Sequence, residues 1–229
     1  MKKKFIFILL FLILLLFIIK LFYYMGIIHK KKYFADDFEI EIIKSKIDYN
    51  NNGIDDYTDI LNGAKNDAKN KPRYKSEYYE GGYPPDNIGV CTDLVWRAFK
   101  EAGYSLKDMV NNDIERNLQD YKIDHPDKNI DFRRVTNLRV FFDKYAITLT
   151  NDIYDIDEWM PGDIVIFGNN THIGIVSNYR NNFGISYIIH NGGQPVREED
   201  YLYRANVTKH YRFDASLIDD KVLYSWYFE

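Results

Sequence analysis

Cysteine is the scarcest reactive residue in this chain of 229 residues, because Cys91 is the only one. A single cysteine excludes an internal disulfide, and its distance from the N-terminus excludes anchoring through a lipoprotein modification. A lone cysteine is either a small buried hydrophobe, which is common for free cysteine, or a residue retained for its chemistry. Composition alone does not choose between these two readings.

Acidic residues are absent from the first 32 residues. Seven of the 30 basic residues lie there, so the rest of the chain carries 23 Lys and Arg against 34 Asp and Glu. Such an acidic surface argues against a nucleic-acid partner. It suits a protein that works beside divalent cations outside the cell. The sequence also lacks an internal repeat and a low-complexity linker.

The N-terminal segment is apolar from Phe5 to Ile28 with few exceptions, and it follows three lysines. As a helix it would be roughly 36 Å long at about 1.5 Å per residue, enough to cross a bilayer of about 30 Å. A cleaved signal peptide has the same start, but no A-x-A-like site precedes His29. We therefore predict an uncleaved signal anchor over residues 1–32 and a single-pass cell-membrane protein. The long remainder is predicted to be extracytoplasmic, although basic residues on both flanks give this orientation only weak support.

The remaining chain has the length of one globular domain. Apolar spacing predicts helices at about residues 33–47, 60–70, 91–103, 105–121 and 137–145. Three later segments rich in β-branched residues, 164–167, 173–177 and 186–190, predict an antiparallel meander. Helices followed by strands indicate an α+β fold, with N-terminal helices packed on a small antiparallel sheet.

Cys91, His172 and His190 are candidates for a nucleophilic site. Cys91 opens a predicted helix, where free backbone amides and the helix dipole favour a thiolate. His172 begins one predicted strand and His190 ends the next, so pairing of these strands would bring both rings to one sheet edge. A nucleophilic cysteine needs a base within hydrogen-bond reach and a group that orients the base. Taken alone, each histidine is more often a satisfied core or surface imidazole.

Five segments carry a resemblance to known proteins: GVCTDLVWRAF, NIDFRRVTNLRVFF, PGDIVIFG, HIGIVSN and IIHNGG. They resemble the domain of unknown function 1287 family and, more broadly, the NlpC-type papain-like cell-wall cysteine peptidases. The resemblance covers roughly residues 64–211. It implies a papain-like core over residues 64–229, a catalytic set of Cys91, His172 and His190, and amide hydrolysis through a thioester. The implied substrate is a peptidoglycan stem peptide, and the chemistry requires no cofactor.

Two positions depart from these relatives. Phe132 stands where a histidine is expected in an NIDHRR pattern, so that position supplies no ionisable group and is interpreted as structural. Cys91 is followed by Thr92 and Asp93, whereas better-known cell-wall members carry an Asp-Cys-Ser run. The substrate contacts of those members therefore do not transfer to this chain.

Three further residues are candidates for substrate binding. Tyr83, in the loop before the cysteine, could line a cleft, and Arg133 and Arg134 could bind a stem-peptide carboxylate. Aromatic packing and a solvated or structural role explain the same residues equally well. The alternatives to a hydrolase are a non-catalytic wall-binding or calcium-braced scaffold module of the same fold, and an enzyme that transfers acyl groups on lipid.

The membrane-proximal segment, residues 33–63, contains a second motif. Its Asp, Asn and Gly residues occupy positions 1, 3, 5, 6, 9 and 12 of an EF-hand-like loop, and a backbone carbonyl falls at position 7. A solvated Asn/Asp turn has the same composition. We predict a structural calcium ion that braces the chain near the membrane, with these ligands: Asp48, Asn50, Asn52, Ile54, Asp56 and Asp59.

Overall fold

The computed structural model describes residues 2–25, 28 and 31–226. The α-helices are α1 (Lys2–Tyr24), α2 (Asp56–Asn70), α3 (Cys91–Glu101), α4 (Leu106–Arg116) and α5 (Val135–Tyr145). The strands are β1 (Arg73–Tyr74), β2 (Ile88–Gly89), β3 (Ile147–Thr148), β4 (Ile164–Phe167), β5 (His172–Arg180), β6 (Ser186–Ile189), β7 (Glu198–Glu199) and β8 (Val207–Arg212). Short 3-10 turns are η1 (Ala35–Phe38), η2 (Leu118–Asp120), η3 (Asp131–Arg133), η4 (Leu202–Arg204), η5 (Ala215–Leu217) and η6 (Asp220–Val222).

A six-stranded antiparallel sheet has the order β3-β8-β4-β5-β6-β7. The predicted meander is its β4-β5-β6 part, and the α+β class is confirmed. β8 was not predicted, because its sequence, VTKHYR, lacks the continuous apolar run of its neighbours. A separate two-stranded parallel pair joins β1 to β2 directly before Cys91.

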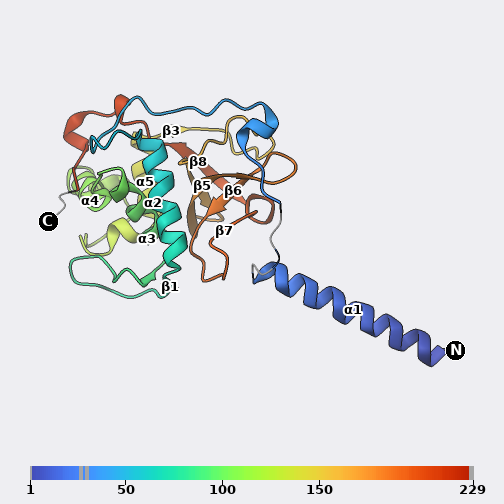
Figure 1. The fold of residues 1–229 in the computed structure, drawn as a ribbon. Coiled ribbons are helices and arrows are strands. Elements are labelled where there is room, and N and C mark those ends of the chain that lie inside the picture. Colours follow the sequence, from blue (N-terminus) through green and yellow to red (C-terminus); the bar gives the residue numbers. More distant parts are fainter. Residues whose placement is uncertain (1, 26–27, 29–30, 227–229) are drawn as a thin grey trace.

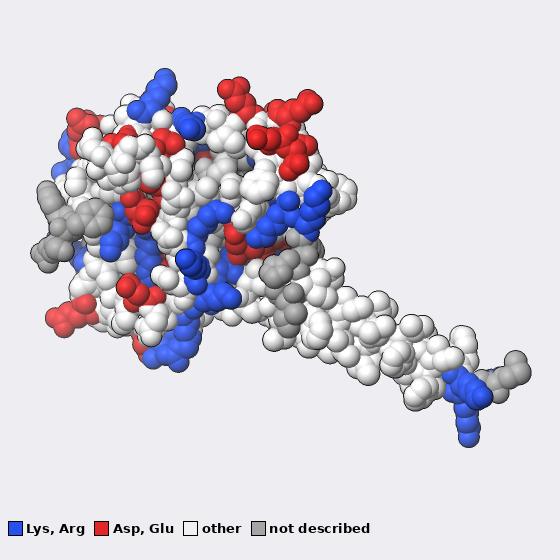
Figure 2. Space-filling model, viewed as in Figure 1, with Lys and Arg blue, Asp and Glu red and all other residues white. Residues whose placement is uncertain are grey.

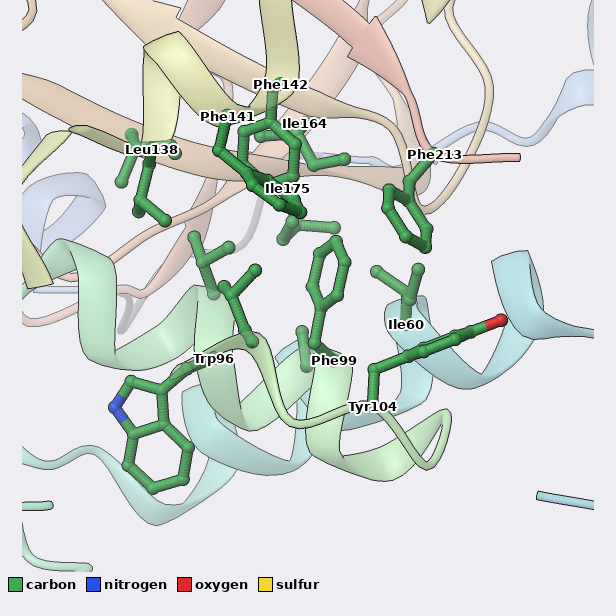
Figure 3. Packing of buried hydrophobic residues seen from close by; sticks show 14 of the residues in the cluster. Ile60, Trp96, Phe99, Tyr104, Leu138, Phe141, Phe142, Ile164, Ile175 and Phe213 are labelled. Atoms are coloured by element: carbon green, nitrogen blue, oxygen red, sulfur yellow. The ribbon is translucent and has the colours of Figure 1, made fainter. Parts of the chain in front are cut away.

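Both faces of the central strands are buried, which explains their unbroken apolar sequence. Successive side chains of a strand point to opposite faces, so Ile164 and Ile166 join the main core while Val165 and Phe167 join a second one. The main core lies between the sheet and the helices α2, α3, α4 and α5. Figure 3 shows Phe99 of α3 among Ile60, Phe142 and Phe213 in this core.

Helix α3 is held between α2 and strand β5. Its close approach to α2 depends on Gly63, where an added Cβ would lie 2.8 Å from the Ala98 Cα. Burial of each Leu, Ile or Phe side chain contributes about 1.5–3 kcal/mol to the stability of the fold. The buried apolar face of α3 therefore fixes this helix firmly between α2 and the sheet. The first residue of α3, Cys91, is thereby positioned beside β5.

The apolar helix α1 projects from the rest of the molecule, and its surface is almost free of charge along its length (Figures 1 and 2). It is long and apolar enough to cross a membrane, and a signal sequence has the same features. The predicted anchor over residues 1–32 therefore has its helix at Lys2–Tyr24.

The predicted helix over residues 33–47 is wrong. That segment contains only the short turn η1, and Tyr33 forms an antiparallel bridge with Arg180 of β5. Pairing with the sheet and burial of Ile40 outweigh the weak local helical pattern. The predicted boundary at residue 63 lies inside α2.

Candidate active site

Cys91 is the first residue of α3, and it is only 6% exposed. The chain enters the helix through an extended Val90, whose N–H donates to Asp93 Oδ2 at 2.8 Å. This cap leaves the N–H groups of Cys91 and Thr92 facing the sulfur, and the N–H of Ile173 in β5 faces it as well. The thiol therefore lies against β5, beside the strand residue that follows His172.

The two predicted histidines lie together. Because β5 and β6 are antiparallel, the start of β5 and the residue after β6 are at the same end of the sheet. His172 Nε2 lies 2.8 Å from His190 Nδ1, and the rings meet edge to face. His172 is partly exposed, whereas His190 is buried. One imidazole thus holds the other in place.

A carboxylate completes this chain of contacts. Glu199 of β7 places Oε1 3.2 Å from His190 Nε2, and its other oxygen accepts from Arg204. Burial alone would raise the pKa of Glu199, but hydrogen bonds from His190 and Arg204 outweigh it and hold that pKa below the usual range. Sequence reasoning missed Glu199, since residues 197–201 carry no strand pattern that would place it beside His190.

The loop after β6 is hydrogen-bonded to β2, the strand just before Cys91. Asn191 is fully buried, and its Nδ2 donates to the carbonyls of Pro72 at 3.3 Å and Gly89 at 3.1 Å. Gly89 lies two residues before the cysteine. The histidine loop and the entry to α3 are therefore joined directly, which makes the relation between nucleophile and base rigid.

Two tyrosines lie near Cys91. Partial burial raises the pKa of Tyr74 and of Tyr201, and the charge of a Cys91 thiolate raises both pKa values further. The Tyr201 ring lies 4.2 Å from that of His190 and 5.8 Å from that of His172. Tyr74 is exposed and lies beside Gly193 of the same loop. Cysteine, histidines and these rings therefore form one cluster.

The resting protonation of the cluster follows from its burial. Burial raises the pKa of the Cys91 thiol to about 11. Burial, with a further contribution from His190, lowers the pKa of His172 to about 4. The gap corresponds to roughly 10 kcal/mol against proton transfer. An ion pair at about 4 Å would recover only about 4 kcal/mol at an effective dielectric constant of ~20. The resting pair is therefore a neutral thiol and a neutral imidazole.

Arg133 and Asp93 form a buried ion pair behind the nucleophile. Arg133 Nε and Nη2 donate to the two Asp93 oxygens at 2.7 and 2.9 Å, and the side chains are 2% and 0% exposed. Trp96 Nε1 donates to the same carboxylate at 2.9 Å. Arg133 is thus occupied by a structural partner, and its predicted role in substrate binding stays a prediction.

The other two predicted substrate-binding residues make different contacts. Tyr83 packs its ring against Trp96, Phe132 and Trp226, with ring centroids 4.7, 5.5 and 5.1 Å away. The Arg134 side chain is 58% exposed and has a 3.6 Å contact with Asp131. Phe132 is fully buried, in agreement with a structural interpretation.

The predicted calcium loop is closed by its own hydrogen bonds. Asn50 and Asn52 donate to Asp59 Oδ2 at 3.0 and 2.9 Å, and Gly53 N–H donates to Asp48 Oδ2 at 2.8 Å. Asp56 turns to the core, where it accepts from Tyr104 at 2.5 Å, and Ile54 is exposed. Within the described residues, no group of three or more His, Cys, Asp or Glu could hold a metal ion. The oxygen-rich side chains of the loop are of the kind that calcium prefers. The bound calcium ion stays a prediction.

A cavity of about 300 Å³ lies elsewhere, between the segment after the anchor and the start of α2. Its lining includes Phe34, Ile43, Tyr57 and Pro161 but no residue of the cysteine and histidine cluster. We do not place the site there, because none of these groups is a nucleophile with a base beside it.

Fold and site together define an α+β protein with a cysteine, two histidines and a glutamate gathered at one end of a small sheet. The chain belongs to the family described as Domain of unknown function (DUF1287), whose model matches residues 61–213. It is also similar to "Uncharacterized protein YijF" of Escherichia coli (strain K12), with 36% identity over 149 residues, 62% of this chain and 72% of that protein. No solved structure matches the chain. The predicted membership of the 1287 family is confirmed.

Proposed function

We propose that this protein is a membrane-anchored, extracytoplasmic cysteine hydrolase with a papain-like core, and that it cleaves amide bonds in peptidoglycan stem peptides. One observation carries the proposal: a cysteine at the start of a buried helix lies against the strand whose first residue, His172, is held by His190 at 2.8 Å. Nucleophile, base and orienting group are the three parts that thiol catalysis requires.

The reaction begins from the neutral pair. As the Cys91 sulfur attacks the peptide carbonyl, its proton passes to His172 and a C–S bond forms. His172 then gives this proton to the leaving amine nitrogen as the C–N bond breaks, which leaves a thioester. Water attacks the thioester, its proton passes through His172 to the sulfur, and the carboxylic acid product leaves. The backbone N–H of Cys91 is a candidate donor to the oxyanion, because it lies at the helix start.

Anchoring supports the choice of substrate class. Helix α1 has the length and composition of a membrane span, and the remainder of the chain has an excess of acidic residues. A hydrolase tethered to the cell membrane acts on material close to the external face of that membrane. Cell-wall peptide is such material. The Tyr201 ring, which packs against both imidazoles, provides an apolar surface that suits a peptide backbone.

The test is digestion of purified peptidoglycan by the full chain in detergent, followed by mass analysis of the soluble products. The parent should release peptide fragments that are absent with Cys91→Ser, a change of one atom at the nucleophile. His172→Gln should lose the same products. Wall binding without products from the parent would favour the non-catalytic module, and turnover of added lipid in place of peptide would favour acyl transfer.

A further inference from the structure

The two site histidines share one hydrogen bond, and which nitrogen of each carries the proton decides whether His172 can act as a base. Burial lowers the pKa of both imidazoles, so each carries a single ring proton at neutral pH. Each neutral imidazole has one donor and one acceptor nitrogen. The arrangement of protons along the chain of contacts is therefore set by whatever lies at its end.

At that end lies Glu199, which can only accept. Its carboxylate faces His190 Nε2 at 3.2 Å, so this nitrogen must carry the proton of His190. His190 Nδ1 is then an acceptor, and His172 Nε2, 2.8 Å away, must donate to it. The remaining nitrogen of His172, Nδ1, is left without a proton. That nitrogen is the one free to accept the thiol proton.

Gln194 contacts the same ring but does not decide between its tautomers. Its Oε1 accepts from Gly192 N–H at 2.7 Å and its Nε2 donates to the His190 carbonyl at 3.0 Å, so backbone groups fix which end is nitrogen. The same Nε2 lies 3.2 Å from both His190 Nδ1 and His190 Nε2. Because this donor is equally close to the two ring nitrogens, the tautomer of His190 follows from its contact with Glu199.

Arg204 holds Glu199 in the orientation that this arrangement needs. The guanidinium donates to Oε2 and leaves Oε1 for the histidine. It also lies over the Tyr201 ring, which packs against both imidazoles and Phe167. Arg197 is a further cation near His190, and its charge adds to the burial that lowers the pKa of that ring.

We propose that Glu199, oriented by Arg204, is a positioning residue that fixes both histidines as Nε2–H tautomers and so leaves Nδ1 of His172 as the proton acceptor. The chemical use of that nitrogen rests on the proposed hydrolase function. The tautomers themselves do not, since they follow from the hydrogen-bond chain alone.

The test is a pair of two-bond ¹H–¹⁵N correlation spectra of the full chain in detergent, with the five histidines assigned by substitution. In the parent at neutral pH, His172 and His190 should both show a protonated Nε2 and a bare Nδ1. In Glu199→Gln, Arg204 should retain the amide oxygen, so the amide nitrogen faces His190 and donates to it. Both tautomers should then invert to Nδ1–H.

Glu198→Gln is the matched control, because this neighbouring carboxylate bonds to Ser177 and Lys65 and should leave the tautomers unchanged. If the parent hydrolyses peptide, kcat of Glu199→Gln should fall at least about 100-fold with little change in KM. A parent with Nδ1–H on His172, or a Glu199→Gln variant with unaltered tautomers, overturns the proposal. Correct tautomers in a chain that cleaves nothing would sink the hydrolase function and leave this inference standing.

Discussion

The neutral resting pair makes a quantitative prediction about alkylation of Cys91 by iodoacetamide. Only the thiolate reacts, and a thiol with a pKa of about 11 is ionised in about one molecule in 10⁴ at pH 7. An ordinary cysteine with a pKa of about 8.5 is ionised to about 3%. Alkylation should therefore be about 300-fold slower than for a free thiol, before any further slowing by poor access.

The shape of the pH profile is independent of access. Between pH 6 and about pH 9.5 the rate should rise tenfold for each unit, because the whole range lies below the pKa of the thiol. His172→Gln should leave the profile nearly unchanged, since a neutral imidazole contributes no charge to the thiolate. Intact-protein mass measures the reaction without ambiguity, because Cys91 is the sole cysteine, and Cys91→Ser gives the blank.

An ion pair predicts the opposite behaviour. Its thiolate would already be formed near neutrality, so the rate would reach a plateau by about pH 6. His172→Gln would then remove the plateau, because the imidazolium that stabilises the thiolate is gone. A plateau that depends on His172 would refute the argument from burial, and the proposed reaction would begin from a pre-formed thiolate.

Two further predictions concern stability, both measured on the full chain in detergent. Arg133→Met should lower the free energy of unfolding by about 3–5 kcal/mol, because it leaves the buried Asp93 charge without its arginine partner. The control Arg134→Met, at the exposed neighbouring residue, should change the free energy of unfolding by less than about 0.5 kcal/mol. Equal effects of the two substitutions in denaturant titrations would contradict this prediction. Calcium at about 100 times its Kd should stabilise the parent by about 2.7 kcal/mol and should not stabilise Asp48→Asn. An unchanged thermal midpoint of the parent at 10 mM CaCl₂ would remove the calcium prediction.

The local sequence pattern predicted the helix and strands that hold Cys91 and the two histidines. It did not predict some of the segments that pack against them. Helix α3 begins at Cys91 as expected. The breaker-rich loop before it ends at Val90, and apolar residues recur at helical spacing directly after it, so both signals lie within one short segment. The strands β4, β5 and β6 were found for the same reason, since their β-branched runs are bounded by turn residues. Their pairing then brought His172 and His190 together, as inferred from strand order.

The elements that failed depend on distant contacts. Residues 33–47 have a weak helical pattern, but the bridge from Tyr33 to Arg180 and burial of Ile40 determine their path. Glu199 lies on a two-residue strand whose place is fixed by pairing with β6. No periodicity is visible over two residues, so its contact with His190 could not be read from the sequence.

The ion pair between Asp93 and Arg133 explains how an acidic residue can lie in the same helical turn as a nucleophilic sulfur. An unpaired carboxylate there would oppose formation of a thiolate, and Asp93 does raise the pKa of Cys91. Bidentate contact with Arg133 offsets part of that charge, while the same oxygens cap the helix at Val90 and hold Trp96. The segments GVCTD and FRR, 40 residues apart, therefore act as one unit. The carboxylate can fix the helix start that presents the sulfur, because the arginine reduces the electrostatic cost of placing it there.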